Sequence, residues 1–129
     1  ERVIEALNQH EKSLKGSKIL VLGVAYKKDI DDERESPGYS IMKLLLEKGA
    51  IVDYNDPWIP VLKQTRKYNF QKKSIPITPD LLKEMDAAII ITDHSAYDYA
   101  EIVKHSNLVI DTRNATSKIE RVDGKIFSA

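Results

Sequence analysis

Cysteine is absent from this chain of 129 residues. Its absence excludes disulfide bonds, thiolate metal ligands and a nucleophilic thiol within the chain. Long apolar segments are absent too. The longest apolar run, residues 87–91, is far too short to cross a bilayer, which takes about 20 apolar residues. No segment resembles a signal peptide, so we expect a cytoplasmic protein without a membrane partner.

The chain also has no net charge, because its 20 basic and 20 acidic side chains cancel. Proteins that bind nucleic acid usually carry a strongly basic surface. The balance of charge therefore gives no reason to expect a nucleic-acid partner. Any affinity for phosphate must be local and depend on a few cations.

Apolar runs alternate with amphipathic segments along the chain. Strands are predicted at residues 18–23, 51–54, 86–92 and 108–111, with a further strand or tail at the end; helices are predicted at residues 1–13, 37–48, 61–68, 81–85 and 97–105. The first strand is continuously apolar, as a strand buried on both faces of a parallel sheet is. The alternation predicts right-handed crossovers. We therefore expect an α/β fold: a Rossmann-like, doubly wound, mostly parallel sheet with helices on both faces.

Residues typical of helix ends support these boundaries. Ser36 precedes Pro37 and Thr78 precedes Pro79, and each pair combines a good N-cap residue with a proline that suits the first helical turn. Gly49 follows the second helix, where glycine commonly ends helices.

In open parallel sheets, ligands bind beyond the carboxyl ends of the strands. This rule selects four loops, which follow Gly23, Tyr54, Ile91 and Ile110. The first loop lacks the glycine-rich turn of dinucleotide-binding folds but carries three cations, Lys27, Lys28 and Arg34. Two interpretations remain open: a phosphate held by side-chain charge, or a solvated loop in which nearby carboxylates neutralise the cations.

The other polar residues have simpler interpretations. Asp56-Pro57 is a turn that ends a strand and allows at most an indirect role. Thr92-Asp93-His94 places a histidine beside an aspartate, but without a nucleophile the pair forms no catalytic triad. The three histidines are scattered without ligand spacing, so no metal site is predicted. Trp58 either packs on the domain edge or contacts a part of the protein that this chain lacks.

Four motifs occur in order along these loops. They are Gly23-Val24-Ala25-Tyr26-Lys27 with Asp32 and Arg34-Glu35-Ser36-Pro37, then Tyr54-Asn55-Asp56-Pro57, Thr92-Asp93-His94 and Asp111-Thr112-Arg113-Asn114. Together they resemble the carboxy-terminal, nucleotide-sugar-binding domain of the UDP-glucose/GDP-mannose dehydrogenase family. The residues of the first loop are most similar to those of members that act on UDP-N-acetylhexosamines. UDP-N-acetylglucosamine is the first expectation, followed by the N-acetylmannosamine and glucose substrates.

The resemblance implies an NAD-dependent enzyme that oxidises the sugar C6 hydroxyl to a carboxylate. In this family the amino-terminal domain holds NAD and the catalytic cysteine. Residues 1–13 would then be the tail of the interdomain helix and residues 14–129 the nucleotide-sugar-binding domain. The expected partners are a UDP-sugar and the protein's own amino-terminal domain, within a homodimer or larger assembly. The fragment alone is expected to be inactive.

The resemblance also assigns roles to individual residues. Tyr26 and Lys27 match the pair that contacts the UDP-sugar, and Arg113 matches an arginine that contacts the substrate. Arg34 matches the arginine that reaches towards NAD. No catalytic residue is expected in this chain.

The alternative is a non-catalytic nucleotide-binding or oligomerisation module. The start of the chain at Glu1, inside an expected helix and without an initiating methionine, favours a fragment of a larger enzyme.

Overall fold

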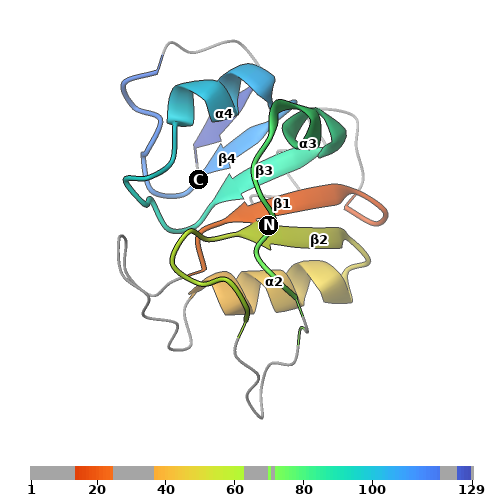
Figure 1. Ribbon diagram of the computed structural model, residues 1–129. Helices are drawn as coiled ribbons and strands as arrows, with labels where there is room; N and C mark the ends of the chain where they lie inside the picture. Colours follow the sequence, from red (N-terminus) through yellow and green to blue (C-terminus); the bar gives the residue numbers. More distant parts are fainter. Residues whose placement is uncertain (1–13, 25–36, 63–69, 71, 120–124, 129) are drawn as a thin grey trace.

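The computed structural model describes residues 14–24, 37–62, 70, 72–119 and 125–128. Its elements are β1 (Lys18–Leu22), α2 (Pro37–Glu47), β2 (Ile51–Asn55), α3 (Pro79–Glu84), β3 (Ala87–Ile90), α4 (Tyr99–His105), β4 (Val109–Asp111) and β5 (Ile126–Ser128). The strands form one sheet in the order β2-β1-β3-β4-β5, and every neighbouring pair is parallel (Figure 1). The predicted parallel α/β fold is confirmed.

Helices cover both faces of this sheet. α2 lies on one side, and α3 and α4 lie on the other (Figure 1). In β1, Ile19 and Val21 join the core cluster that contains α2, whereas Leu20 and Leu22 join the cluster that contains α3 and α4. Successive side chains of a strand point to opposite faces. The continuous apolar run of β1 therefore fills two cores, as the sequence predicted.

The ends of α2 and α3 agree with the local signals. α2 begins at Pro37, and the chain leaves it through Gly49, whose φ is +89°. Thr78 caps α3, because its hydroxyl accepts a hydrogen bond from the Leu81 amide at 3.1 Å. The predicted cap Ser36 lies outside the described residues.

α4 begins two residues later than predicted. Its N-cap is Asp98, whose side chain accepts a hydrogen bond from the Glu101 amide at 3.2 Å. Tyr97 lies before the helix, because its ring is buried and its hydroxyl donates to the backbone oxygen of Asn55 at 2.7 Å. A long-range contact therefore decides where this helix starts.

The predicted helix at residues 61–68 is wrong at its start. Val61 forms an antiparallel bridge with Lys73, and the Leu62 amide donates to the Lys72 oxygen at 3.2 Å. The two stretches are paired as extended chain, which an isolated helical pattern does not reveal. Residues 63–69 lie outside the described part of the chain, as does the predicted helix at residues 1–13. Of the two alternatives for the end of the chain, a strand or a tail, the structure shows a strand, β5.

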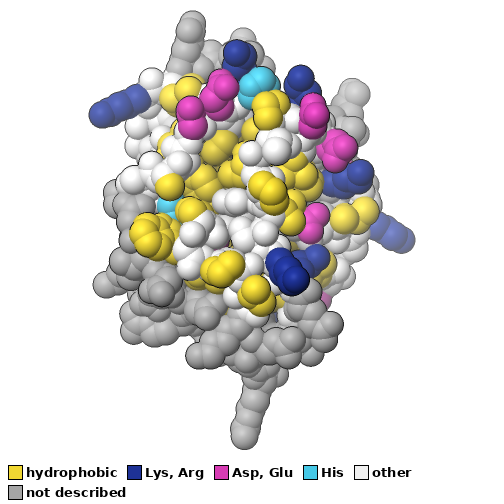
Figure 2. All heavy atoms as spheres, in the orientation of Figure 1, with side chains coloured by type: hydrophobic (Ala, Val, Ile, Leu, Met, Phe, Trp, Pro, Cys, Tyr) yellow, Lys and Arg dark blue, Asp and Glu magenta, His cyan; other side chains and the backbone are white. Residues whose placement is uncertain are grey.

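Charged side chains are mixed on the surface. In Figure 2, acidic and basic side chains are interspersed along the upper part of the molecule, and hydrophobic side chains gather towards the middle. The described residues on this face thus form no patch of one sign. Within the described residues, no helix is long and apolar enough to cross a membrane.

Candidate functional site

The strand order places β1 between β2 and β3, so the chain turns in opposite directions after β1 and after β3. In open α/β sheets this reversal opens a crevice at the carboxyl ends of the strands. We call the described residues that follow β1 to β4 the carboxyl edge: residues 23–24, 56–59, 91–94 and 112–116. These segments belong to the four loops that the sequence selected.

Gly23 brings the end of β1 very close to the end of β3. Its φ is +86°, and a Cβ added there would lie 2.5 Å from the Thr92 oxygen. The Gly23 amide donates to the Asn55 oxygen at 2.9 Å, and the Thr92 amide donates to the Leu22 oxygen at 3.3 Å. The end of β1 is therefore held between the ends of its two neighbours.

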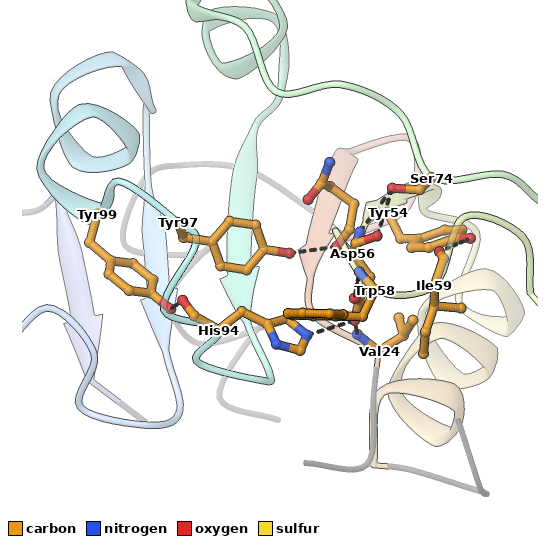
Figure 3. A network of polar contacts seen from close by, with 10 residues as sticks. Val24, Tyr54, Asp56, Trp58, Ile59, Ser74, His94, Tyr97 and Tyr99 are labelled. Atoms are coloured by element: carbon orange, nitrogen blue, oxygen red, sulfur yellow. Dashed lines mark hydrogen bonds and ion pairs between the residues drawn. The ribbon is translucent and has the colours of Figure 1, made fainter. Parts of the chain in front are cut away.

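A buried carboxyl group joins three of the strand ends (Figure 3). Asp56 Oδ2 accepts a hydrogen bond from the Val24 amide at 2.8 Å and lies 2.9 Å from His94 Nε2. Asp56 Oδ1 accepts a hydrogen bond from the Trp58 amide at 2.8 Å. Since a carboxylate only accepts, Nε2 is the donor in the contact with His94. The side chains of Asp56 and His94 are both fully buried.

This pair was not predicted from the sequence, where Asp56 was assigned to a turn and His94 was considered only beside its neighbour Asp93. The sequence did place both residues after strands, Asp56 directly after β2 and His94 four residues after the end of β3, but only the strand order shows that these two strands flank β1. The His94 side chain contacts Asp56 and not its neighbour Asp93.

Two tyrosines complete the network around His94. The Tyr99 hydroxyl donates to the His94 oxygen at 2.8 Å, and the Tyr97 ring lies 5.8 Å from the His94 ring. Burial, together with nearby Asp56 and Tyr99, raises the pKa of Tyr97 far above its ordinary value. Tyr97 is thus a protonated hydrogen-bond donor over the whole physiological range and not a proton acceptor.

A second carboxyl group shapes the turn after β4. Asp111 is buried and accepts hydrogen bonds from the Arg113, Ala115 and Thr116 amides at 3.0, 3.1 and 2.8 Å. It also accepts a hydrogen bond from the Thr116 hydroxyl at 2.6 Å. Within this turn Asn114 adopts a left-handed conformation with φ of 60°. The turn holds the backbone from which the Arg113 side chain extends.

Arg113 is the one predicted site residue that the structure describes. Its Nε lies 3.7 Å from Asp93 Oδ1, and 46% of the side chain is exposed. An exposed ion pair at this distance contributes little to stability, so the guanidinium remains accessible to a ligand. Tyr26, Lys27 and Arg34 lie outside the described residues, which resume only at Pro37. Val24, held by Asp56, is the last described residue before them.

Metal ligands do not gather in the described residues, where no three His, Asp or Glu side chains cluster. His105 lies on α4, 3.7 Å from Glu101 one turn earlier, and takes no part in the carboxyl edge. The end of β1 lacks the feature by which dinucleotide-binding folds hold the pyrophosphate of NAD. After Gly23 the next glycine is Gly38, so the chain lacks the glycine turn that admits a pyrophosphate.

A cavity of about 250 Å³ lies between α3 and α4. It is lined mainly by apolar residues, together with Asp98, Glu101 and His105, and by no lysine or arginine. Two carboxyl groups without a cation disfavour a diphosphate. The carboxyl edge, and not this cavity, is therefore the candidate site for a nucleotide.

Comparison with known proteins identifies the family. Residues 20–118 match the UDP binding domain of the UDP-glucose/GDP-mannose dehydrogenase family. The chain is 37% identical over 112 residues to the UDP-glucose 6-dehydrogenase of Rickettsia bellii, covering 81% of this chain and 25% of that protein. It is 30% identical over 105 residues to the UDP-N-acetyl-D-mannosamine dehydrogenase of Methanococcus maripaludis, covering 75% of this chain and 22% of that protein.

Solved structures agree with the fold. The UDP-N-acetyl-mannosamine dehydrogenase of Staphylococcus aureus superposes with a TM-score of 0.67 at 27% identity, over 98% of this chain and 29% of that one. The NDP-N-acetyl-D-galactosaminuronic acid dehydrogenase of Methanosarcina mazei has a TM-score of 0.75 at 24% identity, over 99% of this chain and 27% of that one. The chain spans about a quarter of the length of these relatives. It belongs to the UDP-glucose/GDP-mannose dehydrogenase family, in which it corresponds to the UDP binding domain.

Proposed function

We propose that this chain is the UDP-sugar-binding part of an NAD-dependent nucleotide-sugar 6-dehydrogenase. The observation that carries the proposal is the match to a UDP binding domain over residues 20–118, which include the whole carboxyl edge. Arg113 supports it chemically, because an accessible guanidinium at that edge can form paired hydrogen bonds with a phosphate.

The sites follow the family pattern. Tyr26 and Lys27 contact the UDP-sugar, and Arg113 contacts it from the turn after β4. Arg34 reaches towards NAD, which is bound mainly by an amino-terminal domain. Residues 14–129 are the nucleotide-sugar-binding domain and residues 1–13 the tail of an interdomain helix. The whole enzyme oxidises the sugar C6 hydroxyl to a carboxylate and works as a homodimer or larger assembly in the cytoplasm, in polysaccharide biosynthesis.

For the sugar we propose UDP-N-acetylglucosamine, because the sequence of the loop after β1 is most similar to members that act on UDP-N-acetylhexosamines. Relatives carry names with other sugars, UDP-glucose and UDP-N-acetyl-D-mannosamine. Affinities for these three ligands, compared in the full-length enzyme, decide among them. A clear preference for UDP-glucose would overturn the choice of sugar and leave the nucleotide site intact.

Calorimetric titration of this chain with UDP, GDP and NAD tests the nucleotide site. We expect UDP to bind, and Lys27→Ala and Arg113→Ala each to weaken it about tenfold, equivalent to about 1.4 kcal/mol. Lys83→Ala is the matched control, because Lys83 is an exposed cation in the last turn of α3, away from the carboxyl edge. Tight binding of NAD, or no binding of UDP by the folded chain, would contradict the proposal.

A further inference from the structure

We propose that Asp56 and His94 are positioning residues that fix the point where the chain leaves β1, and through it the nucleotide contacts of Tyr26 and Lys27. The second part of this inference, the effect on nucleotide contacts, rests on the proposed function. The first part, that Asp56 and His94 fix the chain where it leaves β1, concerns only the described residues around Val24.

Asp56 is the junction of three strand ends. Its carboxyl group receives the Val24 amide after β1, the Trp58 amide after β2 and the His94 ring after β3. β2 and β3 are not neighbours in the sheet, since β1 runs between them. The contact between Asp56 and His94 therefore crosses over the end of β1, next to Val24.

The hydrogen bond at Val24 holds the chain just beyond the sheet ladder. The Gly23 amide still donates to the backbone of Asn55 on β2, but the next amide donates to the side chain of Asp56. The direction of the chain at Val24 thus depends on where the Asp56 carboxyl group points. Tyr26 follows two residues later.

His94 fixes that direction from the other side. Its Nε2 donates to Oδ2, the same oxygen that accepts the Val24 amide. The His94 backbone is in turn held by the Tyr99 hydroxyl, and the Asp56 amide donates to the Ser74 hydroxyl at 2.9 Å. Both partners are therefore anchored independently, so the carboxyl group has little freedom to rotate.

Stability alone is a weak explanation for such a pair. Replacing a buried ion pair with apolar side chains is often neutral or stabilising, because the desolvation of two polar groups offsets their attraction. A buried pair does determine where its hydrogen-bonded neighbours lie. Here the determined neighbour is the first residue of the loop that carries two proposed nucleotide contacts.

The test compares two ends of the same strand. Asp56→Asn keeps the shape but leaves one of the two amides, Val24 or Trp58, without a carboxylate oxygen. Asp86→Asn is the matched control, because Asp86 Oδ2 accepts the Lys18 amide at 2.8 Å at the opposite end of β1. His94→Leu removes the ring donor, and His94→Gln restores a donor at similar reach.

Two measurements are made on each variant: amide hydrogen exchange resolved by residue, and calorimetric titration with UDP. We expect Asp56→Asn and His94→Leu to speed exchange at Val24 about tenfold and to weaken UDP about tenfold. Asp86→Asn should speed exchange at Lys18 and leave UDP affinity unchanged. His94→Gln should return both readouts to within about threefold of the starting protein.

The inference is overturned if exchange at Val24 stays unchanged in Asp56→Asn and His94→Leu. It is also overturned if Asp86→Asn weakens UDP as much as Asp56→Asn does, because the effect would then be general destabilisation. If the unmodified chain binds no UDP, the proposed function fails and the nucleotide half of the inference fails with it. Exchange at Val24 still decides the other half.

Discussion

At the scale of single residues, two buried aspartates each accept hydrogen bonds from backbone amides at the carboxyl edge. Asp56 joins three strand ends, whereas Asp111 organises the single turn after β4. Burial alone would raise the pKa of Asp111. The hydrogen bonds from Thr116, Arg113 and Ala115 outweigh that effect and hold the pKa of Asp111 below its ordinary value. Folding therefore favours the ionised form of this carboxyl group.

Asp111→Asn should destabilise the protein by about 2 kcal/mol at neutral pH, because the amide nitrogen leaves two donors of the turn without an acceptor. A lowered folded pKa means that the stabilisation is complete above the unfolded pKa of about 3.9 and is lost as the pH falls through the folded value. The difference in unfolding free energy between Asp111→Asn and the unmodified protein should therefore narrow below about pH 4.

Urea denaturation at a series of pH values measures this difference. Thr78→Ala is the control, because it removes the cap of α3, at a cost of about 1 kcal/mol, without removing a titrating group. Its difference from the unmodified protein should stay constant across the same range. A constant difference for Asp111→Asn as well would contradict the assigned role of the carboxylate.

At the scale of elements, the end of β1 is constrained both by its backbone conformation and by its contacts with the ends of β2 and β3. Gly23 combines a positive φ with a close approach to the Thr92 backbone, and the next residue donates to Asp56. Gly16, before the same strand, has a similar φ of +82° but open space where a Cβ would lie. The two glycines thus separate the cost of backbone conformation from the cost of crowding.

Gly23→Ala should cost about 3 kcal/mol or more of unfolding free energy, since it adds a clash with the Thr92 oxygen to the left-handed strain. Gly16→Ala should cost only about 1 kcal/mol, because strain is its sole penalty. Thermal and urea unfolding of both variants measure the costs. Equal effects of the two substitutions would mean that β1 and β3 approach less closely than the structure describes.

At the scale of the whole molecule, the chain corresponds to one domain of its longer relatives. It spans about a quarter of the length of its relatives and contains no cysteine. The carboxyl edge offers an arginine and a network of hydrogen bonds that hold the backbone. Such an edge can bind and orient a nucleotide sugar.

This chain alone should therefore form no NADH from NAD with UDP-N-acetylglucosamine or UDP-glucose. The reason is the proposed organisation of the enzyme, in which the cofactor site and the family's catalytic cysteine belong to an amino-terminal domain. Absorbance of NADH follows the reaction, and a full-length UDP-glucose 6-dehydrogenase serves as the positive control. Turnover above the protein-free blank would refute the division of labour between domains.

Local patterns in the sequence determined the elements of this fold. Continuous apolar runs predicted β1 and β3, and the pairing of Thr78 with Pro79 predicted the start of α3. These signals work because a capping hydrogen bond lies within one helical turn, and because a strand that is covered on both faces needs apolar residues at successive positions. The order of the loop motifs indicated the family in the same way, and the match over residues 20–118 confirms it.

The tertiary structure decided how those elements meet. The pairing of Val61 with Lys73 and the late start of α4 at Tyr99 depend on contacts with distant backbone. The pair of Asp56 and His94 joins residues 38 positions apart in the sequence. Their contact exists because the sheet places β1 between β2 and β3, so that both strand ends reach the same point. Strand order depends on the packing of the whole chain, and no local pattern encodes it.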